Sequence, residues 1–97
     1  MTQQYLVGEL SVRLAQLQEA ADRPAADLFA SLRRDVETAP PHALGPAVER
    51  AIRLADEFCR DSVRRGDVTS FDGLAAWSAE LREFAACAGL LDREASG

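Results

Sequence analysis

The most reactive side chains in this chain of 97 residues are one histidine, His42, and two cysteines, Cys59 and Cys87. Zinc motifs that use two histidines, and the paired Glu-x-x-His motifs of di-iron bundles, both need a second histidine. Nucleophilic catalysis by cysteine needs a base and an orienting group beside the thiol, and His42 lies in a proline-rich stretch. We therefore predict no metal site, no cofactor, no catalytic residues and no enzymatic activity.

Cys87 is the one residue for which we consider a redox role, as an intersubunit disulfide. A helical projection places it near Glu80 and Glu83, and neighbouring carboxylates disfavour the reactive thiolate. Two cysteines do not form the disulfide framework of a small secreted domain. The default prediction is a cytoplasmic protein with reduced thiols, and the disulfide through Cys87 is kept as a hypothesis.

The balance of charges argues against polyanionic partners. Acidic residues outnumber basic ones by 16 to 11, which sets a formal net charge of −5. Affinity for nucleic acid or anionic membrane surfaces comes first from clustered cations, and the sequence has no basic run, so we predict neither partner. No stretch reaches the roughly 18 uncharged apolar residues of a membrane-spanning helix, and the N-terminus lacks the basic start of a signal peptide.

Apolar residues recur at three- and four-residue steps, which predicts amphipathic helices. Residues that start or stop helices divide this pattern. Pro24 suits the start of a helix, and Pro40-Pro41 separates the chain into two halves. Gly66 suits the end of a helix, and residues 69–72 resemble a capping box at the start of the next one. The predicted helices span 3–21, 24–37, 42–65 and 70–91, with a frayed tail at 92–97. The predicted fold is one all-α domain over 1–97, a small antiparallel bundle of four helices. The alternative has three helices, the first kinked at Pro24.

The same spacing predicts the buried side of each helix. The inward stripe of the second helix is Ala25, Leu28, Phe29, Leu32 and Val36. On the third helix it is Val48, Ala51, Ile52, Ala55, Phe58, Cys59, Ser62 and Val63. On the fourth helix it is Leu74, Trp77, Leu81, Phe84, Ala88 and Leu91.

Further apolar residues fall outside these stripes and form the predicted interface. One strip runs along the back of the last helix: Ala75, Ala79, Ala86 and Leu90. Tyr5 and Val12 project from the back of the first helix. Such residues can form a patch for a partner helix, and the partner we predict is a second copy of the chain. In the other interpretation, alanine serves helix propensity and the remaining residues are scattered exposure.

Three segments of the chain resemble a known group of proteins. They are Tyr5-Leu6-Val7-Gly8-Glu9-Leu10-Ser11, Arg65-Gly66-Asp67 with the following Phe71, and Ala79–Phe84 with Cys87-Ala88-Gly89-Leu90-Leu91. These segments resemble small, uncharacterised helical proteins of GC-rich actinomycete bacteria. The arginine-only set of cations agrees with the codon usage of such genomes. The resemblance implies a bacterial cytoplasmic source and carries no known activity.

The leading functional prediction is a non-enzymatic protein-interaction or regulatory module that is homodimeric through helix faces. The alternative is a small-molecule-binding bundle, with or without weak enzymatic activity, whose cavity is lined by Phe58, Phe71, Trp77 and Phe84. Aromatic residues at helical spacing form a core more often than a binding cavity, which favours the first prediction. A structural component of a larger assembly is a third interpretation, which the sequence does not separate from the first.

Overall fold

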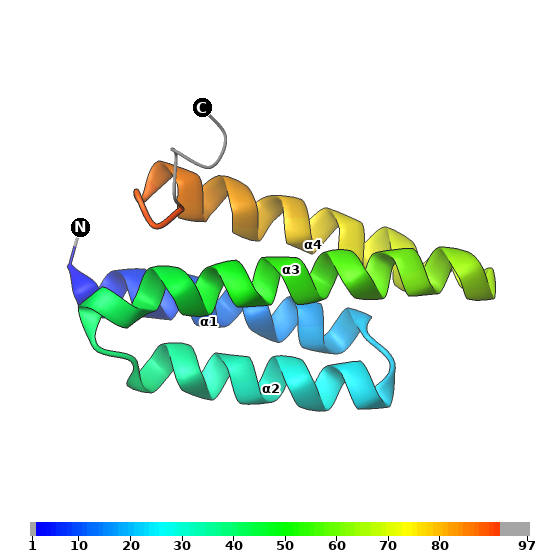
Figure 1. Cartoon of the computed structure of the whole chain (residues 1–97), viewed down its shortest axis with the longest axis horizontal. Helices are drawn as coiled ribbons and strands as arrows, with labels where there is room; N and C mark the ends of the chain where they lie inside the picture. Colours follow the sequence, from blue (N-terminus) through cyan, green and yellow to red (C-terminus); the bar gives the residue numbers. More distant parts are fainter. Residues whose placement is uncertain (1, 92–97) are drawn as a thin grey trace.

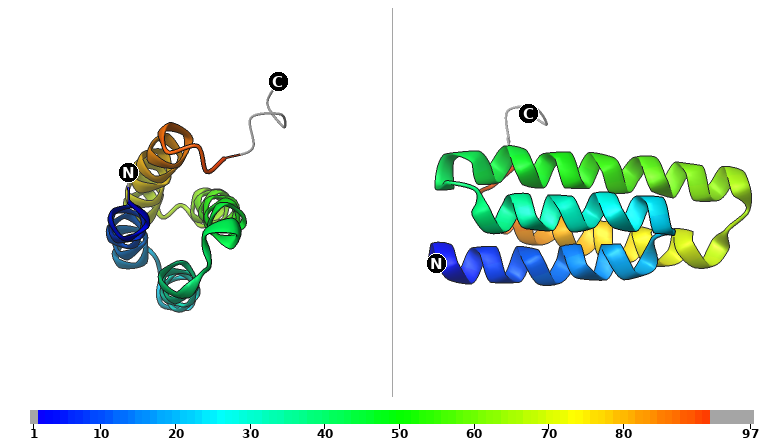
Figure 2. Two further views of the ribbon diagram at one scale, coloured as in Figure 1. Left: turned by 90° about the vertical axis from the view of Figure 1, so that its left-hand side faces the viewer. Right: turned by 90° about the horizontal axis from the view of Figure 1, so that it is seen from below.

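The computed structural model describes residues 2–91, which fold into four α-helices (Figure 1). Their bounds are α1 Gln3–Ala20, α2 Arg23–Thr38, α3 Pro41–Arg65 and α4 Val68–Cys87. Viewed along the bundle, the helices form a ring in sequence order, so α1 lies between α2 and α4 and diagonal to α3 (Figure 2). The predicted all-α bundle of four helices is confirmed, and the predicted tail at 92–97 lies outside the described residues.

The helical conformation is interrupted between α1 and α2, and the two segments are not one bent helix. Ala21 and Asp22 have extended backbone conformations, with ψ angles of 157° and 163°. Pro24 stands in the first turn of α2, where its missing amide hydrogen removes no helical hydrogen bond. The three-helix alternative with a kink at Pro24 is therefore wrong.

Each helix turns one apolar stripe toward a shared core. The largest fully buried apolar side chains are Leu10, Leu14, Leu17, Phe29, Val36, Leu44, Val48, Leu74 and Leu81. Phe29 of α2 and Phe58 of α3 meet edge to face, with ring centroids 5.8 Å apart. Burying such side chains is worth about 2 kcal/mol each, so these stripes hold the two hairpins together.

Several positions predicted to face inward are not buried. Leu28 of α2 is 48% exposed and Val63 of α3 is 61% exposed. Trp77 and Phe84 of α4 are half-buried, whereas the fully buried residues of that helix are Leu74, Ser78, Leu81 and Ala85. The buried stripe of α4 is rotated by about one residue from the prediction, because α4 packs against α1 on one side and α3 on the other.

The α3–α4 turn is built from one glycine and one capping aspartate. Gly66 ends α3 as predicted, with a left-handed φ of 72° that suits glycine. Asp67 caps α4, since its carboxylate accepts a hydrogen bond from the Ser70 amide at 3.1 Å. Helix α4 therefore begins at Val68, and the predicted capping box at 69–72 is wrong. It ends at Cys87 rather than at residue 91, because the chain turns at Gly89, which has a φ of 75°.

Helix α3 is the longest element, and its C-terminal end projects from the bundle. It has 25 residues and continues through Pro46, whereas α1 has 18 residues. At about 1.5 Å per residue, α3 is longer by roughly 10 Å. The end of α3 and the start of α4 extend past the α1–α2 turn (Figure 1). This projecting end exposes side chains that the first hairpin does not cover.

Candidate interaction surface

The residues with chemical reactivity do not come together in one site. His42 is exposed at the start of α3, and Cys59 lies half-buried on the same helix, 17 residues further along. That spacing corresponds to about 25 Å along the helix. Among the described residues, no group of three or more His, Cys, Asp or Glu side chains is arranged to hold a metal ion. Burial, together with the negative charge of Asp56, raises the pKa of the Cys59 thiol, so Cys59 stays protonated at neutral pH.

Cys87 lies where the helical projection placed it. It is exposed at the end of α4 and lines a groove between α1 and α4 with Arg13, Glu80, Glu83 and Phe84. In this groove the Arg13 guanidinium stands over the Phe84 ring, 4.4 Å from its centroid. The groove is therefore occupied by a cation–π contact made within the chain. The intersubunit disulfide through Cys87 stays a hypothesis.

The four aromatic residues of the small-molecule alternative do not share one cavity. Phe58 lines a pocket at the junction of the two hairpins, Phe71 lines two hollows at the α3–α4 turn, and Phe84 lines the α1–α4 groove. Trp77 is half-buried and packs against the core. Nothing in this arrangement brings the rings together around a ligand.

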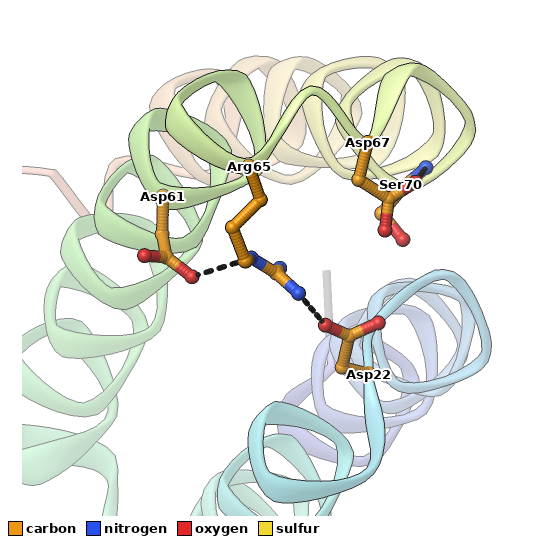
Figure 3. Close-up of polar contacts among 5 residues, drawn as sticks. All are labelled: Asp22, Asp61, Arg65, Asp67 and Ser70. Atoms are coloured by element: carbon orange, nitrogen blue, oxygen red, sulfur yellow. Dashed lines mark hydrogen bonds and ion pairs between the residues drawn. The ribbon is translucent and has the colours of Figure 1, made fainter.

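The pocket beside Phe58 lies at the junction of the two hairpins and combines an apolar wall with charged residues at its rim. It has a volume of about 180 Å³ and is lined by Asp22, Pro24, Ala25, Phe58, Asp61, Ser62, Arg65 and Leu74. At its rim, Arg65 bridges Asp22 of the α1–α2 turn and Asp61 of its own helix, with an Nε to Oδ2 distance of 3.0 Å to Asp61 (Figure 3). The buried Ser62 hydroxyl has no hydrogen-bond partner among the described residues. Most ligand pockets occupy roughly 300–1,000 Å³, so this one is small for a metabolite.

The predicted interface residues are divided between two sides of the bundle. Tyr5 and Val12 are exposed on α1, and the Tyr5 hydroxyl donates a hydrogen bond to Glu9 at 3.1 Å. On α4, Ala79 is exposed, while Ala75, Ala86 and Leu90 are half-buried. Ser78 and Arg82 both reach Asp56 of α3. Ala75 and Ala86 continue that side of α4 at three- and four-residue steps, so much of the alanine strip lies along the contact with α3.

The outer surface formed by α3 and α4, here called the α3–α4 face, carries the most exposed apolar residues. Val63 and Val68 are 61% and 68% exposed and line the same hollow at the projecting end. A second hollow, of about 300 Å³, is lined by Cys59, Arg60, Val63, Arg64 and Phe71. A third hollow of similar volume lies toward the other end, lined by Glu49, Ile52, Arg53, Asp56, Arg82 and Leu91. The face is therefore shallow and extended, and it is not a deep cavity.

Charged side chains border the α3–α4 face along both of its helices. Arg53 and Arg64 are exposed along α3, and Asp72 and Glu83 are exposed along α4. None of these four makes a salt bridge with a described residue. Between the two rows, Arg82 donates to Asp56 at 2.8 Å across the seam of the helices. Glu57 is also exposed on α3, and Glu83 also lines the α1–α4 groove. Apart from the Arg82–Asp56 pair, the exposed charges are thus mainly basic along α3 and acidic along α4.

Sequence reasoning missed Val63 because it assigned Val63 to the inward stripe beside Ser62. Successive residues of a helix are about 100° apart, so Ser62 faces the core while Val63 turns toward α4 and solvent. Two signals in the sequence could have identified this surface. Val63 and Val68 flank the Gly66 helix stop, and the charges at 53, 64, 72 and 83 fall outside the apolar stripes.

The chain was compared with known protein families, with curated proteins and with solved structures, and none of the three comparisons gives a match. Within residues 2–91, no helix is long and apolar enough to cross a membrane.

Proposed function

We propose that this protein is a non-enzymatic protein-interaction module that forms a homodimer through its α3–α4 face. The observation that carries the proposal is the joint exposure of Val63 and Val68 at the projecting end of this face. Isolated apolar residues are common on protein surfaces. Here two exposed valines adjoin half-buried Phe71 and Cys59 in connected hollows, which is the arrangement of an apolar contact patch.

The size of the core also supports association. Of the hydrophobic residues, 18 are alanine, which contribute little buried area each. A chain of this length buries only about 65% of its unfolded surface. A second copy on the α3–α4 face would cover the exposed valines and add buried apolar area to this small core.

Light scattering over a range of micromolar concentrations tests the dimer directly. We expect a mass of about twice the 10.5 kDa of the chain. Replacing Val63 by aspartate places a charge in the proposed contact and should shift the protein to monomer with its helicity unchanged. Val12→Asp is the matched control, because Val12 is 53% exposed on α1, outside the proposed face. A monomer at every concentration, or equal effects of both substitutions, would overturn the proposal.

The two cysteines provide an independent readout. Cys59 lines a hollow of the α3–α4 face, and Cys87 lines the α1–α4 groove. Dimer formation should slow alkylation of Cys59 as the protein concentration rises and leave alkylation of Cys87 unchanged. Peptide mass spectrometry after brief iodoacetamide treatment measures both sites in one sample. A Cys59 rate that does not depend on concentration contradicts the proposed contact.

A further inference from the structure

We propose that the two copies of the dimer are related by a two-fold axis that runs parallel to the helices. In this arrangement α3 of one copy lies over α4 of the other. The inference rests on the proposed homodimer and specifies its geometry. It comes from the positions of four charged residues, two on each helix of the α3–α4 face.

The four charges form the corners of a rectangle. Arg53 and Arg64 are eleven residues apart on α3, and Asp72 and Glu83 are eleven residues apart on α4. Eleven residues make about three helical turns, or roughly 16 Å. All four side chains are exposed, and none of them has a salt-bridge partner within the described chain.

The antiparallel packing of α3 and α4 places these charges at matching heights. The Asp56 carboxylate lies 3.5 Å from the Ser78 hydroxyl and 2.8 Å from an Arg82 guanidinium nitrogen. Position 56 of α3 is therefore level with about position 80 of α4. Three residues from this level, toward the N-terminus of α3 and the C-terminus of α4, lie Arg53 and Glu83. Eight residues from the same level, toward the C-terminus of α3 and the N-terminus of α4, lie Arg64 and Asp72.

Symmetry then decides which charges meet. Two identical faces can pack isologously about a two-fold axis either along the helices or across them. An axis across the helices places α3 on α3 and α4 on α4, which brings arginine rows together and carboxylate rows together. An axis along the helices exchanges the two rows and keeps their heights. Arg64 then meets Asp72 of the second copy, Arg53 meets its Glu83, and each pair occurs twice.

The residues between the corners fit the same arrangement. On α4, Ala76 and Ala79 are exposed between Asp72 and Glu83, so small side chains separate the acidic corners. Arg60 of α3 is level with Ala76 by the same count, and the long arginine stem can pack over a small residue. Val63 is level with the Arg64 corner, and Val68 lies four residues beyond Asp72 on α4, so both valines are at the projecting end of the face. The apolar contact therefore adjoins the predicted Arg64–Asp72 pairs, and the Arg53–Glu83 pairs lie toward the other end.

Charge reversal tests this geometry. Arg64→Glu and Asp72→Arg, made singly, should each weaken dimerisation about 10-fold or more, because each places two like-charge pairs in the contact. The double variant restores both pairs and should return the dissociation constant to within about 3-fold of the original. Asp27→Arg on α2 is the control, because Asp27 is an exposed carboxylate outside the face. Sedimentation equilibrium at low salt measures all four variants.

A second measurement distinguishes the two possible axes. Arg60→Cys and Ala76→Cys, each in a Cys59→Ser/Cys87→Ser background, place one thiol on α3 and one at the same height on α4. With the axis parallel to the helices, position 60 of one copy lies over position 76 of the other, so a mixture of the two variants should form mixed disulfide-linked dimers faster than either variant alone forms its own. With the axis across the helices, α3 lies on α3 and α4 on α4, so the mixed dimer should gain no advantage. If the chain is dimeric but reversal is not rescued, or the mixture crosslinks no faster than the single variants, this geometry is wrong while the homodimer stands. A chain that is monomeric throughout overturns both.

Discussion

The two hairpins of the bundle bury similar apolar stripes, yet they present different surfaces to solvent. On the α1–α2 hairpin, several charged groups are bonded within the chain. Glu9 accepts from Tyr5 and lies 3.7 Å from Arg13, and Glu37 accepts from the Ser11 hydroxyl at 2.9 Å. The exposed apolar residues of this hairpin stand apart from one another: Tyr5, Val12 and Leu28.

On the α3–α4 hairpin the two exposed valines, Val63 and Val68, line one hollow. Of the arginines beside Val63, Arg65 pairs with Asp22 and Asp61, whereas Arg64 has no salt-bridge partner among the described residues. Exposed apolar area alone does not distinguish the two hairpins, because each exposes large hydrophobic side chains. The difference lies in how those residues are grouped, because charges without a salt-bridge partner among the described residues occur on both hairpins, for example Asp27 beside Leu28. Apolar residues grouped in one hollow, with opposite charges in register on the two neighbouring helices, therefore indicate a contact surface more clearly than exposed apolar area alone.

The largest effect we expect is a loss of unfolding free energy, and it distinguishes a buried from an exposed position of the α1–α2 hairpin. Phe29 is fully buried against Phe58, so Phe29→Ala should lower the free energy of unfolding by about 3–5 kcal/mol. Leu28, its neighbour in sequence, is 48% exposed, and Leu28→Ala should change stability by less than about 1 kcal/mol. Urea unfolding followed by circular dichroism, at one fixed protein concentration, measures both.

Leu28→Ala also tests whether exposed apolar residues of the first hairpin are incidental. It should leave the dissociation constant of the dimer unchanged, in contrast to Val63→Asp. A loss of dimer in Leu28→Ala would remove the distinction between the two hairpins, and equal stability losses at positions 28 and 29 would contradict the orientation of α2.

Two glycines within helices give the next largest effect. A Cβ atom at Gly73 of α4 would lie 2.8 Å from the Cβ of Ala20, where the two hairpins meet. Gly73→Ala should therefore push α4 away from α1 and cost about 1–2 kcal/mol. A Cβ atom at Gly8 of α1 meets nothing within 4 Å. Gly8→Ala should instead raise stability by about 0.5–1 kcal/mol, because alanine favours the helix. Thermal unfolding at constant concentration gives the two signs, and a stabilising Gly73→Ala would contradict the close approach of the hairpins.

Much of the fold could be predicted from the sequence because its breakers act locally. Pro24 and Gly66 mark helix boundaries through their own backbone restrictions, and neither depends on distant contacts. The rotation of α4 could not be predicted in this way. Trp77 and Phe84 are among the largest apolar residues of that helix, but the core takes the smaller Ser78 and Ala85 instead. The pattern of a single helix does not show how its two neighbours are placed around it.

The candidate surface was predicted only in part, for a related reason. The alanine strip was identified on α4, but a single helix does not show which neighbour covers it, and α3 covers much of it. Tyr5 and Val12 were joined to the strip because all are apolar, although they lie on α1. The match between Arg53 with Glu83 and Arg64 with Asp72 depends on the register of two antiparallel helices, which no local pattern contains.

The smallest effect we expect compares the caps of the two turns. Asp67 accepts the Ser70 amide hydrogen, whereas Asp22, at the corresponding position before α2, makes no such cap hydrogen bond and pairs with Arg65. The backbone hydrogen bond from Ser70 lowers the pKa of the Asp67 carboxyl below its ordinary value. Asp67→Ala should therefore lower the melting temperature by a few degrees near neutral pH, while Asp67→Ser, which keeps an acceptor oxygen, should lower it less.

Acid dependence checks the physical cause of this effect. A carboxyl whose pKa is lowered by folding contributes stability that is fully present above its unfolded pKa, near 3.9, and is lost as the pH falls through the lower folded pKa. The difference in melting temperature between the original chain and Asp67→Ala should thus be constant near neutrality and shrink below about pH 4. A difference that stays unchanged in acid would mean that Asp67 does not act as an ionised cap, and that the two turns are closed by the same backbone contacts.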